Sequence, residues 1–185
     1  AINHHIDWML ARSPWLNEVE AVDDVLTLSD NTTGMFIHTD SDMGMAQRFV
    51  DIIGRKKVKH LIVISPYWDD KLSALSTFMQ ALTPPKTSLL IQRSQALFPK
   101  SSAADIADFD IYDMDSFPKG KGRFIHAKIF IVQTEKEEHV LFGSANCTFA
   151  AMGNINTSGI NEEASLYRCL PKGHVTEALE LSVFM

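Results

Sequence analysis

Apolar and polar residues follow regular spacings along most of the chain. The apolar run at 35–38 predicts a short strand, and apolar positions at helical spacing over 43–53 predict a helix that ends at Gly54. The continuous apolar run at 60–64 predicts a buried strand. The spacing over 72–82 predicts a second amphipathic helix, which a pair of prolines ends.

Strands and helices alternate in this part of the chain, because a further apolar run at 88–92 follows the second helix. Alternation of this kind indicates βαβ units, in which helices on the faces of a sheet join parallel strands. We therefore expect an α/β fold, with a mixed, largely parallel sheet flanked by helices on both faces.

The second half of the chain carries a more varied pattern, and it contains the only predicted hairpin. The elements that it predicts are a helical turn at 101–107, an exposed edge strand at 108–115, strands at 124–132 and 139–142 that form the hairpin, a last strand at 163–170 and a closing helix at 173–184.

The N-terminal segment shows no sustained periodicity. We expect residues 1–32 to be a linker or the remnant of a preceding domain, and residues 33–185 to be the folded domain. The chain begins on Ala1 and stops on the apolar run 183–185, which suggests a fragment cut from a longer polypeptide.

Composition limits the class of protein. With 185 residues, 45% hydrophobic and 22% charged, the chain is typical of one soluble globular domain. Its net charge of -6 argues against a surface that wraps nucleic acid throughout, but leaves room for a local basic site. No apolar run approaches the roughly 20 residues of a membrane span, so we expect a cytoplasmic protein. Its two cysteines, Cys147 and Cys169, are expected to be free thiols.

Candidate chemistry is concentrated in the last third of the chain. In the predicted strand 124–132, alternation places His126 and Lys128 on one face, about 7 Å apart. An imidazole can attack phosphorus or donate a proton, and an ammonium neutralises charge on phosphoryl oxygens. Further along, Ser144 and Asn146 follow Gly143 where a strand meets the start of a helix, which suits anion binding.

These residues resemble the signature of the phospholipase D superfamily of HKD phosphodiesterases. That signature is His-x-Lys, an Asp five residues on, a Gly-Ser-x-Asn element and a later Glu. The matching positions in this chain are His126, Lys128, Gly143, Ser144, Asn146 and Glu163. The resemblance covers about residues 33–185.

Two features depart from that signature. Position 133, five residues after Lys128, is Gln instead of Asp, which affects local hydrogen bonding more than the chemistry. A complete superfamily site also needs two His-x-Lys elements, and this chain has one. The resemblance therefore implies a second HKD half, from an upstream domain of the same chain or from a homodimer mate.

The resemblance also implies a mechanism that needs no metal and no cofactor. One histidine attacks phosphorus to give a phosphohistidine, and the other protonates the leaving oxygen and then activates water. Lys128 and Asn146 would bind the nonbridging oxygens, and Glu163 would hold the ring of His126. In a C-terminal half, His126 is more often the acid than the nucleophile.

A basic segment leads into the candidate site. Between Asp115 and Glu135 the chain has no acidic residue, and it carries Lys119, Lys121, Arg123 and Lys128. This segment is either a solvated loop or a phosphate-binding funnel, in which Lys121 and Arg123, with Gly143 and Ser144, would contact substrate. A second basic run at 55–59 is expected to complement a helix C-terminus.

Two groups of acidic residues have alternative readings. His38, Asp40 and Asp42, with His4, His5 and Asp7, could bind a metal, but the two aspartates are better explained as helix caps. The aspartates at 108, 110, 113 and 115 lack the spacing of a calcium loop and are expected on an exposed edge.

Taken with the resemblance, these residues favour phosphodiester hydrolysis, with nucleic acid preferred over lipid as substrate. The preference comes from the glycine-spaced basic loop and from the lack of a basic amphipathic membrane helix. The alternatives are a non-catalytic binding or assembly domain of the same fold, or a phospholipid phosphodiesterase or transphosphatidylase.

Overall fold

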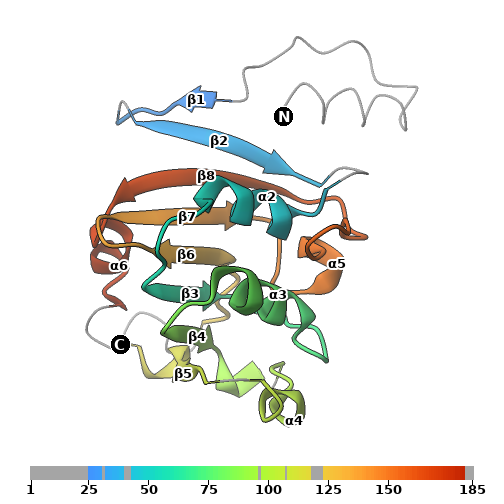
Figure 1. Cartoon of the computed structure of the whole chain (residues 1–185). Helices are drawn as coiled ribbons and strands as arrows, with labels where there is room; N and C mark the ends of the chain where they lie inside the picture. The colour runs from blue at the N-terminus through green and yellow to red at the C-terminus, as the bar shows by residue number, and fades with distance from the viewer. Residues whose placement is uncertain are drawn as a thin grey trace, which may run out of the picture.

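The computed structural model of the chain describes residues 25–30, 32–39, 43–95, 97–106, 108–117 and 123–181. Its described strands form one 8-stranded sheet in the order β1-β2-β8-β7-β6-β3-β4-β5 (Figure 1). The strands are β1 Val25–Thr27, β2 Thr33–His38, β3 His60–Ile64, β4 Thr87–Ile91, β5 Asp110–Asp113, β6 Ile129–Gln133, β7 Glu137–Gly143 and β8 Ala164–Pro171. The helices are α2 Met45–Ile53, α3 Ser73–Leu82, α4 Lys100–Ala103, α5 Phe149–Met152 and α6 His174–Ala178, with short 3-10 turns at Arg93–Gln95 and Met114–Ser116.

The sheet is mixed, as expected, but the expected parallel majority is wrong. Among the described strands, only β3 with β4 and β4 with β5 pair in parallel, and the other five pairings are antiparallel. The reason lies in the strand order. β2 and β3 are joined through α2 as a βαβ pattern predicts, but β8, β7 and β6 are inserted between them. Antiparallel strands from the second half thus fill the middle of the sheet.

Helices cover both faces of the sheet, and this expectation is confirmed. One face packs against α2, α3 and α5 through a large apolar cluster that includes Phe49, Phe78 and Phe130. The ring centroids of Phe49 and Phe78 lie 6.2 Å apart, and those of Phe78 and Phe130 lie 5.3 Å apart. The second face carries a smaller cluster, in which Val175 of α6 and Leu181 contact sheet residues. Each fully buried side chain of this size contributes roughly 1.5–3 kcal/mol.

Most predicted elements lie where the apolar pattern places them. β3 spans His60–Ile64, α3 begins at Ser73, and α2 ends before Gly54, whose φ of 61° suits glycine. The aspartate-rich segment forms β5 at one edge of the sheet, as expected. The described part of the closing helix is limited to α6, which is shorter than predicted.

The N-terminal segment contains one element that periodicity did not reveal. β1, within the segment expected to be a linker, pairs with β2 in register Leu26 to Gly34. Residues 1–24 lie outside the described part, so the domain boundary near residue 32 stays a prediction. Both Cys147 and Cys169 are free thiols. Within the described residues, no helix is long and apolar enough to cross a membrane.

Candidate active site

The candidate residues gather where β3 and β7 end and β6 and β8 begin, on the right in Figure 1, because antiparallel strands begin where their neighbours end. This side of the sheet, which is formed by strand ends and not by an outer strand, is called the candidate edge. Ile129 at the start of β6 pairs with Ile64 at the end of β3. Ser165 at the start of β8 pairs with Gly143 at the end of β7. The segments just before β6 and β8 therefore lie beside those just after β3 and β7. Residues from four separate parts of the sequence thus meet at this edge.

His126 and Lys128 contact each other directly. Lys128 Nζ lies 2.9 Å from His126 Nε2 and 3.1 Å from Nδ1, and it donates to the carbonyl oxygen of His126 at 3.1 Å. The imidazole is exposed, whereas Lys128 is only 7% exposed. Burial lowers the pKa of Lys128, and the negative charge of Glu163 opposes that shift. A buried cation beside an exposed imidazole suits an anionic ligand.

The predicted strand at 124–132 is partly wrong, because β6 begins only at Ile129 and residues 124–128 form no regular structure. The alternation still holds. Ile125, Ala127 and Ile129 line an apolar cavity of about 280 Å³, while His126 and Lys128 contact each other. The side chains still alternate between two sides, as predicted, because the apolar positions can be buried without strand hydrogen bonds.

Two exposed aromatic rings lie together beside His126, with centroids 6.3 Å apart, and the sequence analysis did not assign them to the site. The Tyr67 ring meets the imidazole edge-on at 6.1 Å between centroids, and the Phe124 ring lies 5.6 Å away. Their residues are 41% and 47% exposed. Phe124 shares the alternation of His126, which is a signal that was present in the sequence. Tyr67 follows β3, and only the sheet order brings it here.

Gln92, just after β4, holds the segment that leads into His126. Its amide nitrogen donates to the carbonyl of Arg123 at 2.5 Å and to the Asp115 carboxylate at 2.9 Å. Its amide oxygen accepts from the backbone N–H of Ile125 at 3.0 Å. The side chain of Gln92 thus fixes the backbone on both sides of Phe124. Arg123 is exposed at this edge, whereas Lys119 and Lys121 lie outside the described residues.

Glu163 is buried at the start of β8, and its carboxylate accepts two hydrogen bonds. Ser144 Oγ donates to Oε2, and Asn161 Nδ2 donates to Oε1 at 3.2 Å. The backbone of Glu163 bonds to Thr39 at the end of β2. Among the described residues no hydrogen bond joins Glu163 to His126. The carboxylate instead acts on Ser144 and, through its charge, on Lys128.

Asn146 brings an unsatisfied polar atom to this edge. Its Oδ1 is buried and has no hydrogen-bond partner among the described residues. Leaving such an atom unpaired costs about 1–3 kcal/mol, which a bound donor or water would recover. The next residue, Cys147, donates its N–H to Ser65 Oγ at 3.0 Å and so connects this loop to the end of β3.

Gly143 is required where β7 passes β8. A Cβ at this position would overlap the carbonyl oxygen of Ala164 and approach the Cα of Ser165. The absence of a side chain lets the loop after β7 lie against the start of β8, where Ser144 N donates to the Ala164 carbonyl at 3.0 Å. This close approach positions Ser144 beside Glu163.

Gln133, which departs from the superfamily signature, lies at the other end of β6 from Lys128. It pairs with His60 on β3 and with Glu138 on β7. Its Nε2 donates to Glu138 Oε1 at 2.8 Å, and the fully buried Glu138 carboxylate also accepts from Val175 N at 2.7 Å. Position 133 thus lacks the carboxylate of the signature, but Glu138 supplies a buried carboxylate beside it. Through its bond to Val175, Glu138 also anchors α6.

The other candidate groups have structural roles or lie outside the described residues. Asp40, Asp42, His4, His5 and Asp7 fall outside, and His38 is buried with Nδ1 2.8 Å from the Thr39 carbonyl oxygen. The second basic run does not complement a helix end. Instead Lys56 pairs with Glu137 at 2.8 Å and Lys59 with Glu135 at 3.0 Å, both across to the β6–β7 hairpin.

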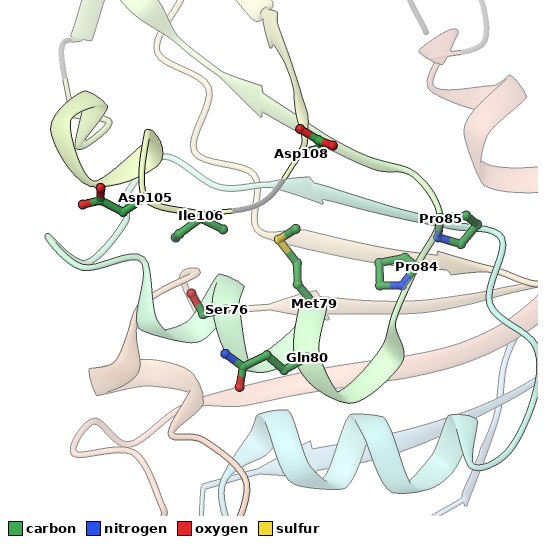
Figure 2. Close-up of a pocket in the computed structure, with 8 residues that line it drawn as sticks. All are labelled: Ser76, Met79, Gln80, Pro84, Pro85, Asp105, Ile106 and Asp108. Carbon is green, nitrogen blue, oxygen red and sulfur yellow. The ribbon is translucent and has the colours of Figure 1, made fainter.

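A larger cavity than the one beside Ile125 lies away from the candidate residues. It has a volume of about 460 Å³ and opens between α3 and the segment before β5 (Figure 2). Met79, Pro84 and Ile106 line it, with Asp105 and Asp108 at its rim, and none of the candidate site residues takes part.

A scan against models of known protein families finds no match, and neither does a search of curated proteins. Solved structures similar to this chain include a mutant of the yeast tyrosyl-DNA phosphodiesterase, with a TM-score of 0.49 and 14% identity over 76% of this chain. This chain spans about a third, 32%, of that protein's length.

Two smaller proteins are also similar. NucT from Helicobacter pylori has a TM-score of 0.45 and 14% identity, with 80% of this chain and 93% of NucT covered. Nuc from Salmonella typhimurium, described as a phospholipase D family member, has a TM-score of 0.39 and 16% identity, with 73% and 81% covered.

Proposed function

We propose that this chain is one half of a metal-independent phosphodiesterase that acts through a phosphohistidine. The observation that carries the proposal is the contact between the exposed imidazole of His126 and the buried ammonium of Lys128, 2.9 Å apart. Ser144, Asn146 and Glu163 lie on adjoining strand ends at the same edge. This set can bind a phosphate and supply a nucleophile or an acid to it.

The reaction needs two histidines, of which His126 is one. In the first step one imidazole nitrogen forms a bond to phosphorus, the bond to the leaving oxygen breaks, and the second histidine gives that oxygen a proton. In the second step the second histidine takes a proton from water, whose oxygen attacks phosphorus and breaks the phosphorus–nitrogen bond. Both histidines return to their starting states.

Lys128 and Asn146 are assigned to the nonbridging oxygens. Burial lowers the pKa of Lys128, and the negative charge of a bound phosphate would oppose that shift and favour the charged form. The Asn146 side chain has an unsatisfied oxygen among the described residues, and its amide nitrogen can donate to phosphate. We propose that the Glu163 carboxylate balances the charge of Lys128 and positions the Ser144 hydroxyl. That Glu163 also holds the His126 ring stays a prediction.

Nucleic acid is the proposed substrate class. The exposed rings of Tyr67 and Phe124, which lie together beside His126 with centroids 6.3 Å apart, offer faces on which bases can stack, worth roughly 1–3 kcal/mol per base. Arg123 is exposed two residues before His126, and Lys121 belongs to the same basic segment. A phosphate backbone flanked by bases satisfies both features, whereas a lipid headgroup uses only the cations.

A second half is proposed to cover this edge. Two large exposed apolar side chains of the described residues, Phe142 and Ile160, belong to it or to its adjoining loops and are not used by the proposed base stacking. Ile160 is 78% exposed. Apolar side chains that remain uncovered beside an incomplete site favour a protein partner at this surface.

The test is hydrolysis of bis(p-nitrophenyl) phosphate and of a single-stranded DNA oligonucleotide, in EDTA, over a wide range of protein concentration. We expect turnover that His126→Ala abolishes and that His174→Ala, an exposed histidine on α6, leaves unchanged. Equal activity of His126→Ala would reject the proposed chemistry. Hydrolysis of phosphatidylcholine vesicles but not of DNA would favour the phospholipid alternative, and binding of DNA without turnover in the full-length protein would favour the non-catalytic one.

A further inference from the structure

A second group of reactive side chains lies where β7 begins and β8 ends, at the opposite ends of the strands from the candidate active site. Glu137 and His139 are two residues apart on β7, and Cys169 pairs with His139 across to β8. One potential ligand atom from each residue lies within 4.8 Å of the other two. We propose that Glu137, His139 and Cys169 bind one Zn²⁺ ion.

The sheet register holds these three side chains on one side. Residues i and i+2 of a strand share a face, and directly paired residues on neighbouring strands lie side by side. Because β7 and β8 pair in register along their whole length, the positions of the donors are set by backbone hydrogen bonds rather than by a loop. Sites on strands are more precise than sites on loops.

The ring of His139 is oriented for a ligand. His139 is fully buried, and its Nδ1 lies 2.8 Å from the hydroxyl of Tyr167. Its other nitrogen, Nε2, lies 3.4 Å from Glu137 Oε2. Histidine ligands of metals commonly bond through one nitrogen while a polar neighbour holds the other. The Glu137 carboxylate also interacts with the Cys169 thiol.

The position between these donors already holds a cation. Lys56 Nζ lies 2.8 Å from Glu137 Oε2 and 3.4 Å from His139 Nε2. The Lys56 side chain is 44% exposed and follows α2, so it can withdraw into solvent. Zn²⁺ would replace its ammonium, and the thiol of Cys169 would lose its proton to become a ligand.

The donor set selects the metal. Sulfur, imidazole nitrogen and one carboxylate oxygen favour Zn²⁺, and Co²⁺ fits the same geometry, whereas Mg²⁺ and Ca²⁺ take oxygen ligands. Tetrahedral zinc separates its ligand atoms by roughly 3.3–3.8 Å, so the group needs to contract by about 1 Å. A fourth position remains for water.

This site would stabilise the fold and not take part in the proposed hydrolysis. β7 runs from Glu137 to Gly143, which separates the two edges by roughly 20 Å. A metal here would join β7 and β8, because all of its ligands come from these two strands. Its test is therefore independent of phosphodiesterase activity.

The experiment is a titration of the reduced, metal-free chain with Co²⁺, followed by competition with Zn²⁺. We expect a thiolate-to-cobalt charge-transfer band and tetrahedral d–d bands that reach saturation at one ion per chain. Cys169→Ser should lose the charge-transfer band, and Cys147→Ser, a buried thiol, should keep it. Saturating Zn²⁺, at about 100 times its Kd, should raise the Tm by roughly 5–10 °C.

Two further variants separate this site from chance binding by other histidines. Glu137→Gln should weaken Co²⁺ binding, and Lys56→Gln should tighten it several-fold because the competing ammonium is gone. Circular dichroism would establish that each variant is folded. The proposal is overturned if no charge-transfer band forms, if the band survives in Cys169→Ser, or if Lys56→Gln binds no more tightly than the parent chain.

Discussion

Lys128 is the residue whose environment is hardest to explain by folding alone. It is almost fully buried, burial lowers its pKa, and its ammonium contacts the ring of His126 instead of forming an ion pair. A buried amine without a directly bonded carboxylate is costly in a folded protein. Its place at the candidate site is therefore better explained by a ligand than by stability.

Lys128→Met provides a test of that argument. We expect the free energy of unfolding to rise by about 1 kcal/mol, because an apolar side chain of similar length replaces a desolvated amine. At the same time kcat/KM should fall by about 10²–10³-fold, because a charge that stabilises the transition state is lost. Urea unfolding and the DNA assay measure the two effects. Lys136→Met, at an exposed hairpin position, is the control and should change neither. A destabilised Lys128→Met variant would mean that the lysine has a structural role.

His60 makes stability depend on pH. Burial, and then the nearby charge of Lys86, lower its pKa from 6.5 to about 4. Between these two values the unfolded chain binds a proton at His60 that the folded chain does not. Stability should therefore fall as the pH decreases from about 6.5 to about 4, by roughly 1–2 kcal/mol for a half-buried ring.

The measurement for His60 is urea unfolding at pH 7 and at pH 4.5. His60→Gln can keep a hydrogen bond to Ser88, which lies 2.8 Å from His60 Nε2, and it does not titrate. We expect the variant to lose less stability than the parent chain across this range. An equal loss in both proteins would assign the pH dependence to other groups.

At the scale of elements, single carboxylates hold the starts of helices. Asp69 accepts from the backbone N–H of Ser73 at 2.6 Å and from that of Phe149 at 3.0 Å, so it links the starts of α3 and α5. Glu138 does the same for α6. Burial alone would raise the pKa of Glu138, but hydrogen bonds from Thr176 and Gln133 lower it overall. These carboxylates fix the positions of the first residues of the three helices.

Glu138→Ala is expected to destabilise the chain by about 3–5 kcal/mol, because it leaves donors of α6 and Gln133 buried without an acceptor. Glu177→Ala, at an exposed position on α6, should cost less than about 1 kcal/mol. Urea unfolding of both variants compares them directly. Similar losses would show that the anchor of α6 is not the buried carboxylate.

Gln133→Asp would restore the residue of the superfamily signature, and we expect it to be harmful here. The new carboxylate would lie beside the buried carboxylate of Glu138, now 2.8 Å from the amide of Gln133. Two like charges this close together, without the Gln133 hydrogen bond, should reduce stability by about 1–2 kcal/mol at pH 7, and less at pH 4, where one can be protonated. Activity per folded molecule should not rise, and a rise would show that position 133 limits the chemistry.

At the scale of the whole molecule, the chain folds around two apolar clusters but offers one histidine of a proposed pair. Its candidate edge carries the buried Lys128 and exposed apolar side chains together. This combination is what one half of a shared site would present before its partner binds. If a second half completes the site, as we propose, activity should depend on assembly.

If a homodimer completes the site, the specific activity should increase with protein concentration and then level off. Ile160→Glu should shift this dependence to higher concentration without unfolding the chain, because the side chain is exposed. Sedimentation at the same concentrations should follow the activity. An active chain that stays monomeric at every concentration would rule out completion by a second copy.

The sequence by itself determined the local elements and the identity of the candidate residues. The apolar period at 60–64 and at 72–82 predicted β3 and α3 closely, because such patterns depend on neighbouring residues. Alternation also kept His126 and Lys128 on one side, even where no strand forms. Gly143, Ser144, Asn146 and Glu163 were found in the sequence through their resemblance to the superfamily signature.

The tertiary structure alone decided which strands are neighbours. The insertion of β8, β7 and β6 between β2 and β3 made the sheet mostly antiparallel, and it brought Tyr67 to His126 and Ser144 to Glu163. No local period encodes these pairings, because they depend on contacts between residues far apart in the chain, such as Ser65 with Cys147. Short motifs in the sequence identify the candidate residues, but long-range strand pairing produces the edge where these residues meet.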